Sequence, residues 1–161
     1  MSIAPKQFRK LVREVLQLFA DQSGSKSFYS ENAVELLMLT AAQETLLGKY
    51  LWQVKGPALG IFQMEPNTYT DIWMNFLTGR TKILLALNDW IPSAGSYELR
   101  MKSNLAYQII MARIFYLRVP ALLPPANDIP AMAAYYKKYW NTHLGAATVS
   151  DAIHNYMKYG T

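Results

Sequence analysis

Glu44 is the acidic residue whose sequence surroundings point most directly to chemistry. It follows the largely apolar run 36–42, and helical spacing places it on the same face as Leu37, Ala41 and Leu47. Burial among apolar side chains disfavours the charged form of a carboxyl group and raises its pKa. A carboxylic acid that keeps its proton near neutral pH can protonate a glycosidic oxygen. The plainer alternative is a glutamate at a helix end that faces solvent.

Other kinds of catalytic chemistry find little support. The chain has no cysteine, which excludes a thiolate zinc site and a cysteine nucleophile. Its two histidines, His143 and His154, do not have the spacing of a ligand pair on one helix face, and we interpret both as surface or capping residues. No glycine-rich phosphate loop is present. We therefore expect no metal ion and no organic cofactor.

Composition and charge limit the classes of partner. With 161 residues, of which 52% are hydrophobic and 17% charged, the chain is expected to form one globular domain. Its net charge of +5 suits an anionic partner such as nucleic acid, a lipid surface or a bacterial envelope. Aromatic and basic residues are not interleaved in one stretch, so we expect no nucleic acid as partner. The absence of a run of ~20 apolar residues predicts no stable membrane insertion. Charges near the N-terminus argue against a signal peptide.

Helical periodicity dominates the elements that must position Glu44. Residues 1–22 contain an amphipathic helix with an apolar stripe, which we expect to pack on the domain; the alternative is a basic module that docks to anionic lipid or to a partner. Ser30 is the expected N-cap of a helix that runs to Leu47, with Gly48 just after it. Further helices are expected at 66–79, 80–88, 99–118 and 130–140, with a loop at 89–96, and Thr148 and Asp151 form a capping-box pattern for the last helix. The predicted fold class is mainly α over 1–161, with at most a short β piece near 57–63.

Four pieces of sequence, in the right order, resemble the signature of lysozyme-like lytic transglycosylases, in the superfamily that includes goose-type lysozyme. The pieces are Ala41-Ala42-Gln43-Glu44-Thr45, then Gly60-Ile61-Phe62-Gln63 with Pro66-Asn67-Thr68, then Ser103-Asn104-Leu105-Ala106, and Ala133-Ala134-Tyr135-Tyr136. The match spans roughly residues 33–140. Thr45 stands where the family usually has serine, Glu65 where an apolar or neutral residue is common, and Tyr136 where asparagine is common.

The resemblance implies a lysozyme-like fold and an activity. Glu44 would protonate the β-1,4 bond between N-acetylmuramic acid and N-acetylglucosamine and then act as base while a 1,6-anhydro ring closes. The alternatives on the same fold are a hydrolytic muramidase and a catalytically inactive virion or peptidoglycan-binding protein. The resemblance also implies a set of substrate-binding residues: Thr45, Gly60, Phe62, Gln63, Asn104 and Tyr135.

Some of these residues receive definite roles. Gln63 would hydrogen-bond the sugar, the Gly60 backbone would let the glycan approach closely, and Tyr135 would hold Glu44 through its hydroxyl. Phe62, with Tyr69 and Trp73, is a candidate wall of a sugar groove, although helical spacing favours the core for the last two. A hydrolase would need a second acid, for which Glu65 and Asp71 are the nearby candidates.

Phage-encoded, virion-associated members of the family resemble the chain most. The implied partners are the peptidoglycan glycan strand and virion or tail proteins. The implied location is synthesis in a host cytoplasm and action in the bacterial envelope, after delivery by a virion or release at lysis.

Overall fold

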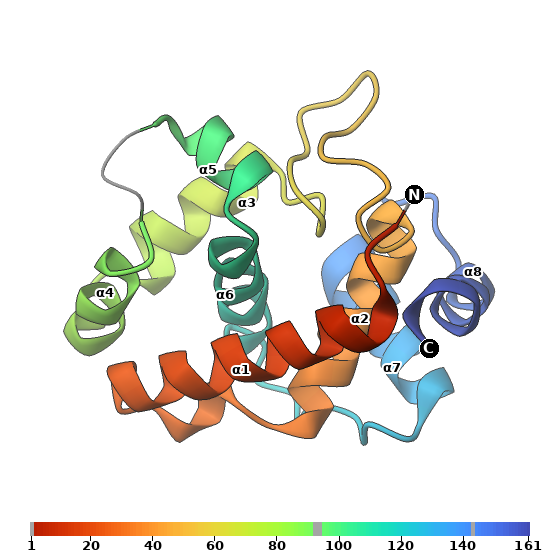
Figure 1. The fold of residues 1–161 in the computed structure, drawn as a ribbon, viewed down its shortest axis with the longest axis horizontal. Helices are drawn as coiled ribbons and strands as arrows, with labels where there is room; N and C mark the ends of the chain where they lie inside the picture. The colour runs from red at the N-terminus through yellow and green to blue at the C-terminus, as the bar shows by residue number, and fades with distance from the viewer. Residues whose placement is uncertain (1, 92–94, 143) are drawn as a thin grey trace.

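Helices account for most of the computed structural model, which describes residues 2–91, 95–142 and 144–161 (Figure 1). The α-helices are α1 (Pro5–Ser23), α2 (Glu31–Thr45), α3 (Pro66–Asp71), α4 (Thr81–Asn88), α5 (Tyr97–Ser103), α6 (Leu105–Leu117), α7 (Ile129–Tyr136) and α8 (Val149–Asn155). A 3-10 helix, η1 (Lys26–Phe28), follows α1, and the π-helical turns η2 (Ile72–Phe76), η3 (Lys137–Asn141) and η4 (Tyr156–Gly160) continue α3, α7 and α8. The mainly α fold class is confirmed.

The β piece near 57–63 is limited to two isolated antiparallel bridges. They join Trp52 to Leu59 and Leu59 to Met64. The segment is therefore a loop held by two isolated bridges rather than a strand.

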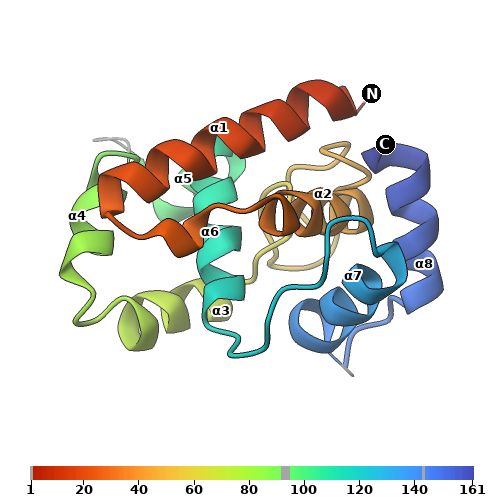
Figure 2. The same ribbon diagram turned by 90° about the horizontal axis from the view of Figure 1, so that it is seen from below.

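The helices form two groups. Helices α2, α7 and α8 lie at one end and α3, α4 and α5 at the other, with α6 between them and α1 crossing both (Figures 1 and 2). Helix α6 can occupy this position because it is apolar on most faces, and residues 107–114 are all buried.

The N-terminal helix is packed on the domain, as its apolar stripe predicts. Phe8, Val12, Leu16 and Phe19 are buried in the common core. The polar side of α1 is tied to α2, because the Arg9 guanidinium donates to Glu35 at 2.6 Å and Arg13 donates to Glu31 at 2.8 Å. Two basic residues of this face are thereby engaged within the domain.

Three predicted helix boundaries are wrong. The helix expected over 99–118 is interrupted at Asn104, which has extended backbone and caps α6 by accepting the Tyr107 N–H at 3.0 Å. Helix α2 ends at Thr45 instead of Leu47, because Leu46 and Leu47 take left-handed φ values of 52° and 58°. The helix expected to end near Gly79 ends at Phe76 as a π-helical turn.

Other local predictions are confirmed. The Ser30 hydroxyl accepts the Ala33 N–H, and Thr148 and Asp151 form a complete capping box. The loop expected at 89–96 includes Pro92, which lies outside the described residues.

Within residues 2–91, 95–142 and 144–161, none of the helices has both the length and the apolar character needed to cross a bilayer.

Candidate active site

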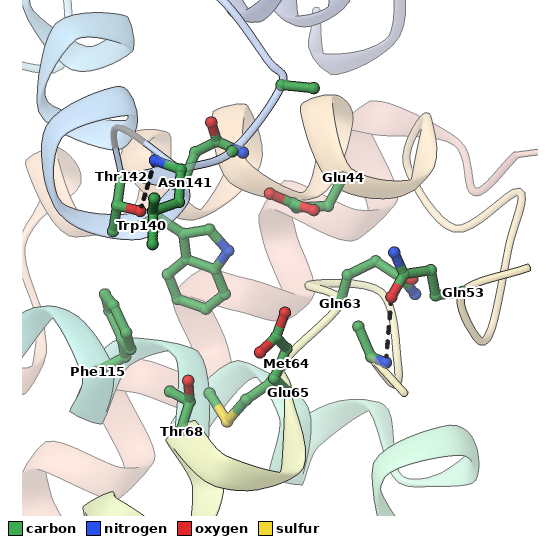
Figure 3. Close-up of a pocket in the computed structure, with 14 residues that line it drawn as sticks. Glu44, Gln53, Gln63, Met64, Glu65, Thr68, Phe115, Trp140, Asn141 and Thr142 are labelled. Atoms are coloured by element: carbon green, nitrogen blue, oxygen red, sulfur yellow. Dashed lines mark hydrogen bonds between the residues drawn. The ribbon is translucent and has the colours of Figure 1, made fainter. Parts of the chain in front are cut away.

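A cleft of about 540 Å³ opens beside the C-terminal end of α2 (Figure 3). Its walls come from five places: α2, the loop and turn that precede α3, the first turn of α3, the end of α6, and the segment after α7. The described residues that line it are Glu44, Gln53, Ala58, Gln63, Met64, Glu65, Thr68, Phe115, Trp140, Asn141, Thr142, Leu144, Gly145 and Ala146.

Glu44 is the acid of this cleft. Its side chain points into the cleft from the last turn of α2, whereas the helix positions before it, from Leu36 to Ala42, are buried (Figure 3). Burial is the largest influence on the Glu44 carboxyl and raises its pKa to about 7; a hydrogen bond from Tyr136 acts in the opposite direction, and the charge of Glu65 adds to the rise. A carboxyl group with this pKa is about half protonated at neutral pH, so it can both give and take a proton.

Glu65 is the second carboxylate of the cleft. It is exposed, at the N-terminal end of α3, and lines the same cavity as Glu44. Figure 3 shows the two carboxylates reaching into the cavity from different walls. The other candidate second acid, Asp71, is outside the cleft: it is exposed, pairs with Arg118 and accepts the Asn75 amide at 2.7 Å.

Thr45 fastens the end of α2 to the turn that faces Glu44. Its buried hydroxyl donates to the Ile61 carbonyl at 2.8 Å and accepts the Gly48 N–H at 2.9 Å. Both hydrogen bonds of the hydroxyl are therefore made within the protein, and Thr45 does not line the cleft. The prediction that Thr45 binds substrate is wrong for this reason. Its contacts explain why the chain can hold two leucines in left-handed conformations next to the acid.

Gln63 lies in the cleft, and Gly60 does not. Gln63 has a left-handed φ of 48°, and its amide donates to the Gly60 carbonyl at 2.7 Å, which fixes its orientation at the cleft wall. Gly60 is buried, and a Cβ there would overlap the backbone carbonyl of Met101 in α5. The prediction that Gly60 lets a glycan approach closely is therefore wrong, because the close approach is to α5.

The tyrosine that holds Glu44 is Tyr136, and the prediction of Tyr135 is wrong. The Tyr136 hydroxyl donates to Glu44 Oε1 at 2.5 Å, whereas the Tyr135 hydroxyl donates to the Ala121 carbonyl at 3.0 Å. Adjacent residues of a helix point about 100° apart, so only one of the two can face α2. The motif contains both tyrosines, but it does not fix the rotation of α7 about its axis.

Substituting Tyr136 with phenylalanine is expected to shift the pH profile of any reaction that uses protonated Glu44. The hydroxyl hydrogen-bonds the ionised carboxylate and holds the pKa of Glu44 down, so its removal raises that pKa further. The alkaline limb of the rate profile then moves to higher pH. The matched control is Tyr135→Phe, which removes a hydroxyl that bonds to a backbone carbonyl. An equal shift in both variants, or a shift to lower pH for Tyr136→Phe, contradicts the assignment.

Phe62 and Asn104, two other residues implied by the resemblance, do not line the cleft. Phe62 is buried, with its ring 6.4 Å from those of Phe8 and Trp140, so it forms core behind the cleft wall. Asn104 caps α6 and donates its amide to the Trp90 carbonyl at 3.0 Å.

The helical spacing of Tyr69 and Trp73 correctly favours the core, against which both pack half-buried. Tyr69 also shares a 2.7 Å hydrogen bond with Tyr107. His154 is exposed on α8, as expected of a surface residue, and His143 lies outside the described residues.

The aromatic wall of the cleft is formed by Trp140 and Phe115, which sequence reasoning missed. Their ring centroids lie 4.4 Å apart. Trp140 follows Tyr136 by four residues, so the helical spacing of these two residues carried a usable signal. The sequence carried no such signal for Phe115, because α6 is apolar on most faces and its spacing does not single out the side that meets the cleft. Flat rings at this place offer a surface for the apolar face of a sugar ring.

Among the described residues, no cluster of three acidic or histidine side chains is suited to hold a metal ion. The chain was also compared with known proteins: no family model matches it, and neither the curated proteins nor the solved structures gave a significant match.

Proposed function

We propose that the protein cleaves the glycan strand of peptidoglycan as a lytic transglycosylase. The observation that carries the proposal is the carboxyl group of Glu44, whose pKa burial raises to about 7, at the wall of an open cleft that also presents aromatic rings and amide side chains. The resemblance of the sequence pieces around Glu44 and Gln63 to lytic transglycosylases gives the proposed bond: the β-1,4 link between N-acetylmuramic acid and N-acetylglucosamine.

The proposed reaction starts with protonated Glu44. Its proton passes to the glycosidic oxygen, the bond from that oxygen to C1 of N-acetylmuramic acid breaks, and N-acetylglucosamine leaves with a free 4-hydroxyl. The positive charge that develops at C1 is relieved by the sugar's own 2-acetamido group. Ionised Glu44 then takes the proton of the 6-hydroxyl while that oxygen attacks C1. The 1,6-anhydro ring closes, Glu44 is protonated again, and no water is consumed.

The surroundings of Glu44 suit both halves of this cycle. Burial favours the protonated acid that begins the reaction, and the Tyr136 hydroxyl stabilises the carboxylate that exists between the two steps. Gln63 and Asn141, which line the cleft, offer amide groups to the acetamido and hydroxyl groups of the sugars.

Hydrolysis by the same cleft is the second candidate, and Glu65 favours it. An inverting glycosidase uses a second carboxylate to activate a water molecule on the face opposite the acid. Glu65 lines the cavity from a different wall than Glu44 and is close enough for its charge to raise the pKa of Glu44.

Mass spectrometry of digested peptidoglycan tests the proposal and separates it from the second candidate. Purified sacculi are digested, and the muropeptides are compared with those released by a known muramidase. We expect products lighter by one water, with no reducing end. Products that carry only reducing ends would overturn transglycosylation and support hydrolysis. No products at all would support the inactive, peptidoglycan-binding alternative.

The proposed place of action is the bacterial envelope, reached in a virion or at lysis. Its support is the resemblance to phage-encoded members, together with a net charge of +5, which suits the anionic envelope. Virion or tail proteins are proposed partners on the same ground.

A further inference from the structure

Lys137 begins the π-helical turn η3, directly after the tyrosine that holds Glu44. Its side chain is half-buried, and its ammonium group donates to Asn141 Oδ1 at 2.7 Å and to the Gly145 carbonyl at 2.8 Å. Both acceptor residues line the cleft. A half-buried ammonium group with two acceptors in the wall of the cleft is a fixed part of that wall.

The backbone between these two acceptors is strained. Thr142 has a φ of 60° and a ψ of −180°, a combination that residues with a side chain rarely adopt. Such a conformation persists where surrounding contacts hold the backbone in place. Lys137 supplies contacts of this kind, because it bonds to the residue before Thr142 and to a carbonyl three residues after it.

Gly145 leaves the space that the Asn141 side chain occupies. A Cβ at Gly145 would lie 2.3 Å from Asn141 Oδ1 and 2.4 Å from its Nδ2. The Gly145 backbone is not in the left-handed region, so the missing side chain serves this close approach rather than a turn. The Asn141 amide is thus located by the Lys137 ammonium and by the Gly145 backbone together.

The orientation of the Asn141 amide follows from its bond with Lys137. A lysine ammonium group donates hydrogen bonds and cannot accept them, so the amide oxygen must face it. The amide nitrogen is then turned the other way, and Figure 3 shows it on the side of Glu44.

Tyr136 accepts the next hydrogen bond. Burial raises the pKa of Tyr136 far above its ordinary value and Glu44 adds to the rise, whereas a hydrogen bond with the Asn141 side chain acts in the opposite direction. A bond that lowers the pKa of a phenol is one that the phenol oxygen accepts, so Asn141 is the donor. The sequence spacing agrees, because a π-helical turn closes between residues five apart.

These bonds form a chain, here called the Lys137 relay, in which every donor points toward the carboxylate. It runs from the Lys137 ammonium through the Asn141 amide and the Tyr136 hydroxyl to Glu44 Oε1. Hydrogen bonds in such a chain polarise one another, so the cation at its start strengthens the bond at its end. The relay therefore favours the ionised carboxylate, which in the proposed reaction exists between the two proton transfers.

We propose that Lys137 is a positioning residue for the catalytic acid, which it reaches through Asn141 and Tyr136. The inference rests on the proposed function for the use of Glu44 as acid and base. Methionine has nearly the length of lysine but no donor, so Lys137→Met frees the Asn141 amide and weakens the bond from Tyr136. The pKa of Glu44 then rises.

An NMR titration of the Glu44 carboxyl group tests this inference without any substrate. Glutamate side chains are labelled with ¹³C, and the Glu44 signal is identified as the one absent from Glu44→Gln. We expect the titration midpoint to move up by about 0.3 pH unit or more in Lys137→Met, because the last bond loses a fraction of its strength. The alkaline limb of the cleavage profile should move in the same direction.

The matched control is Lys138→Met. This lysine is exposed, and its ammonium group lies 5.0 Å from the centre of the Tyr139 ring. Its substitution removes the same charge from the same turn but no member of the relay, so the Glu44 midpoint should stay unchanged.

Two further variants test the route from Lys137 to Glu44. Gly145→Ala keeps the lysine but displaces the Asn141 amide, so it should also raise the midpoint. In the Tyr136→Phe protein the relay has lost its last donor. Adding Lys137→Met to that protein should therefore produce no additional shift.

The inference is overturned if Lys137→Met leaves the Glu44 midpoint unchanged, or if Lys138→Met moves it equally. An equal effect of Lys137→Met with and without the Tyr136 hydroxyl also overturns it, because the charge would then act directly. Cleavage of peptidoglycan is measured in parallel. A raised midpoint in a protein that releases no muropeptides contradicts the proposed function alone, whereas cleavage with an unchanged midpoint contradicts the inference alone.

Discussion

Replacing Glu44 with glutamine is expected to lower the rate of glycan cleavage by about a thousandfold or more while the protein stays folded. The amide has nearly the same shape, but it can neither donate a proton to the glycosidic oxygen nor take one from the 6-hydroxyl. General acid–base catalysis contributes about 10²–10⁴-fold to a rate, and here a single group serves both steps. The measurement is the initial rate of muropeptide release per folded molecule, with folding checked by circular dichroism.

Two further glutamine variants serve as controls for this result. Glu14 is on the exposed side of α1, 3.7 Å from Lys10, and Glu14→Gln should leave the rate unchanged. Glu65→Gln removes a charge that raises the pKa of Glu44, so the alkaline limb of the rate profile should move to lower pH. If the Glu44→Gln protein keeps its rate to within a few-fold, the acid lies elsewhere and the proposed mechanism fails.

The same substitution should also change how stability depends on pH. Because burial raises the pKa of folded Glu44 to about 7, above the ordinary value of 4.5, the folded protein binds more protons than the unfolded chain between these values. The contribution of Glu44 to the free energy of unfolding is complete below pH 4.5 and is lost as the pH rises through 7. A glutamine does not titrate, so this part of the dependence should be absent from Glu44→Gln in denaturant titrations at several pH values.

Local chemistry explains why parts of the structure could be predicted from the sequence. Ser30 and Thr148 cap their helices through hydroxyls that reach a backbone N–H three residues away, so the signal lies within one turn. The apolar stripe of α1 and the burial before Glu44 follow from the helical period. Each of these depends on residues close in sequence.

The wrong predictions concern residues whose position depends on how segments far apart in the sequence pack together. Gly60 and Phe62 belong to a turn whose orientation is set by α5, α1 and the segment after α7, so the motif did not indicate which side faces the cleft. The choice between Tyr135 and Tyr136 is a rotation of about 100° about one helix axis. Phe115 reaches the cleft only because α6 passes behind it. The capping signal of Asn104 lies close in sequence, because its side chain caps the helix that begins at the next residue. The helical spacing of apolar residues on both sides nevertheless predicted one continuous helix.

Gly60→Ala is expected to lower stability by about 3 kcal/mol or more, because three costs add there. The backbone has a left-handed φ of 77°, which costs an L-residue about 1 kcal/mol. The new methyl would also overlap the Met101 carbonyl and come within 2.5 Å of Gln108 Oε1, the atom that accepts the Ile61 N–H. Overpacking of this kind costs about 1–3 kcal/mol, and losing a buried hydrogen bond adds to it.

Gly79→Ala is the matched control, because only one of these costs applies there. Gly79 has a similar φ of 82°, but a methyl group at this position would meet no atom of the described residues within 4 Å, apart from its own chain neighbours. Thermal unfolding should therefore show a fall in Tm of about 3 °C for Gly79→Ala and about 10 °C for Gly60→Ala, since 1 kcal/mol shifts Tm by about 2–4 °C in a domain of this size. Equal, small shifts would mean that α5 yields readily at Gly60. The glycine would then not be required for the packing of the turn against α5.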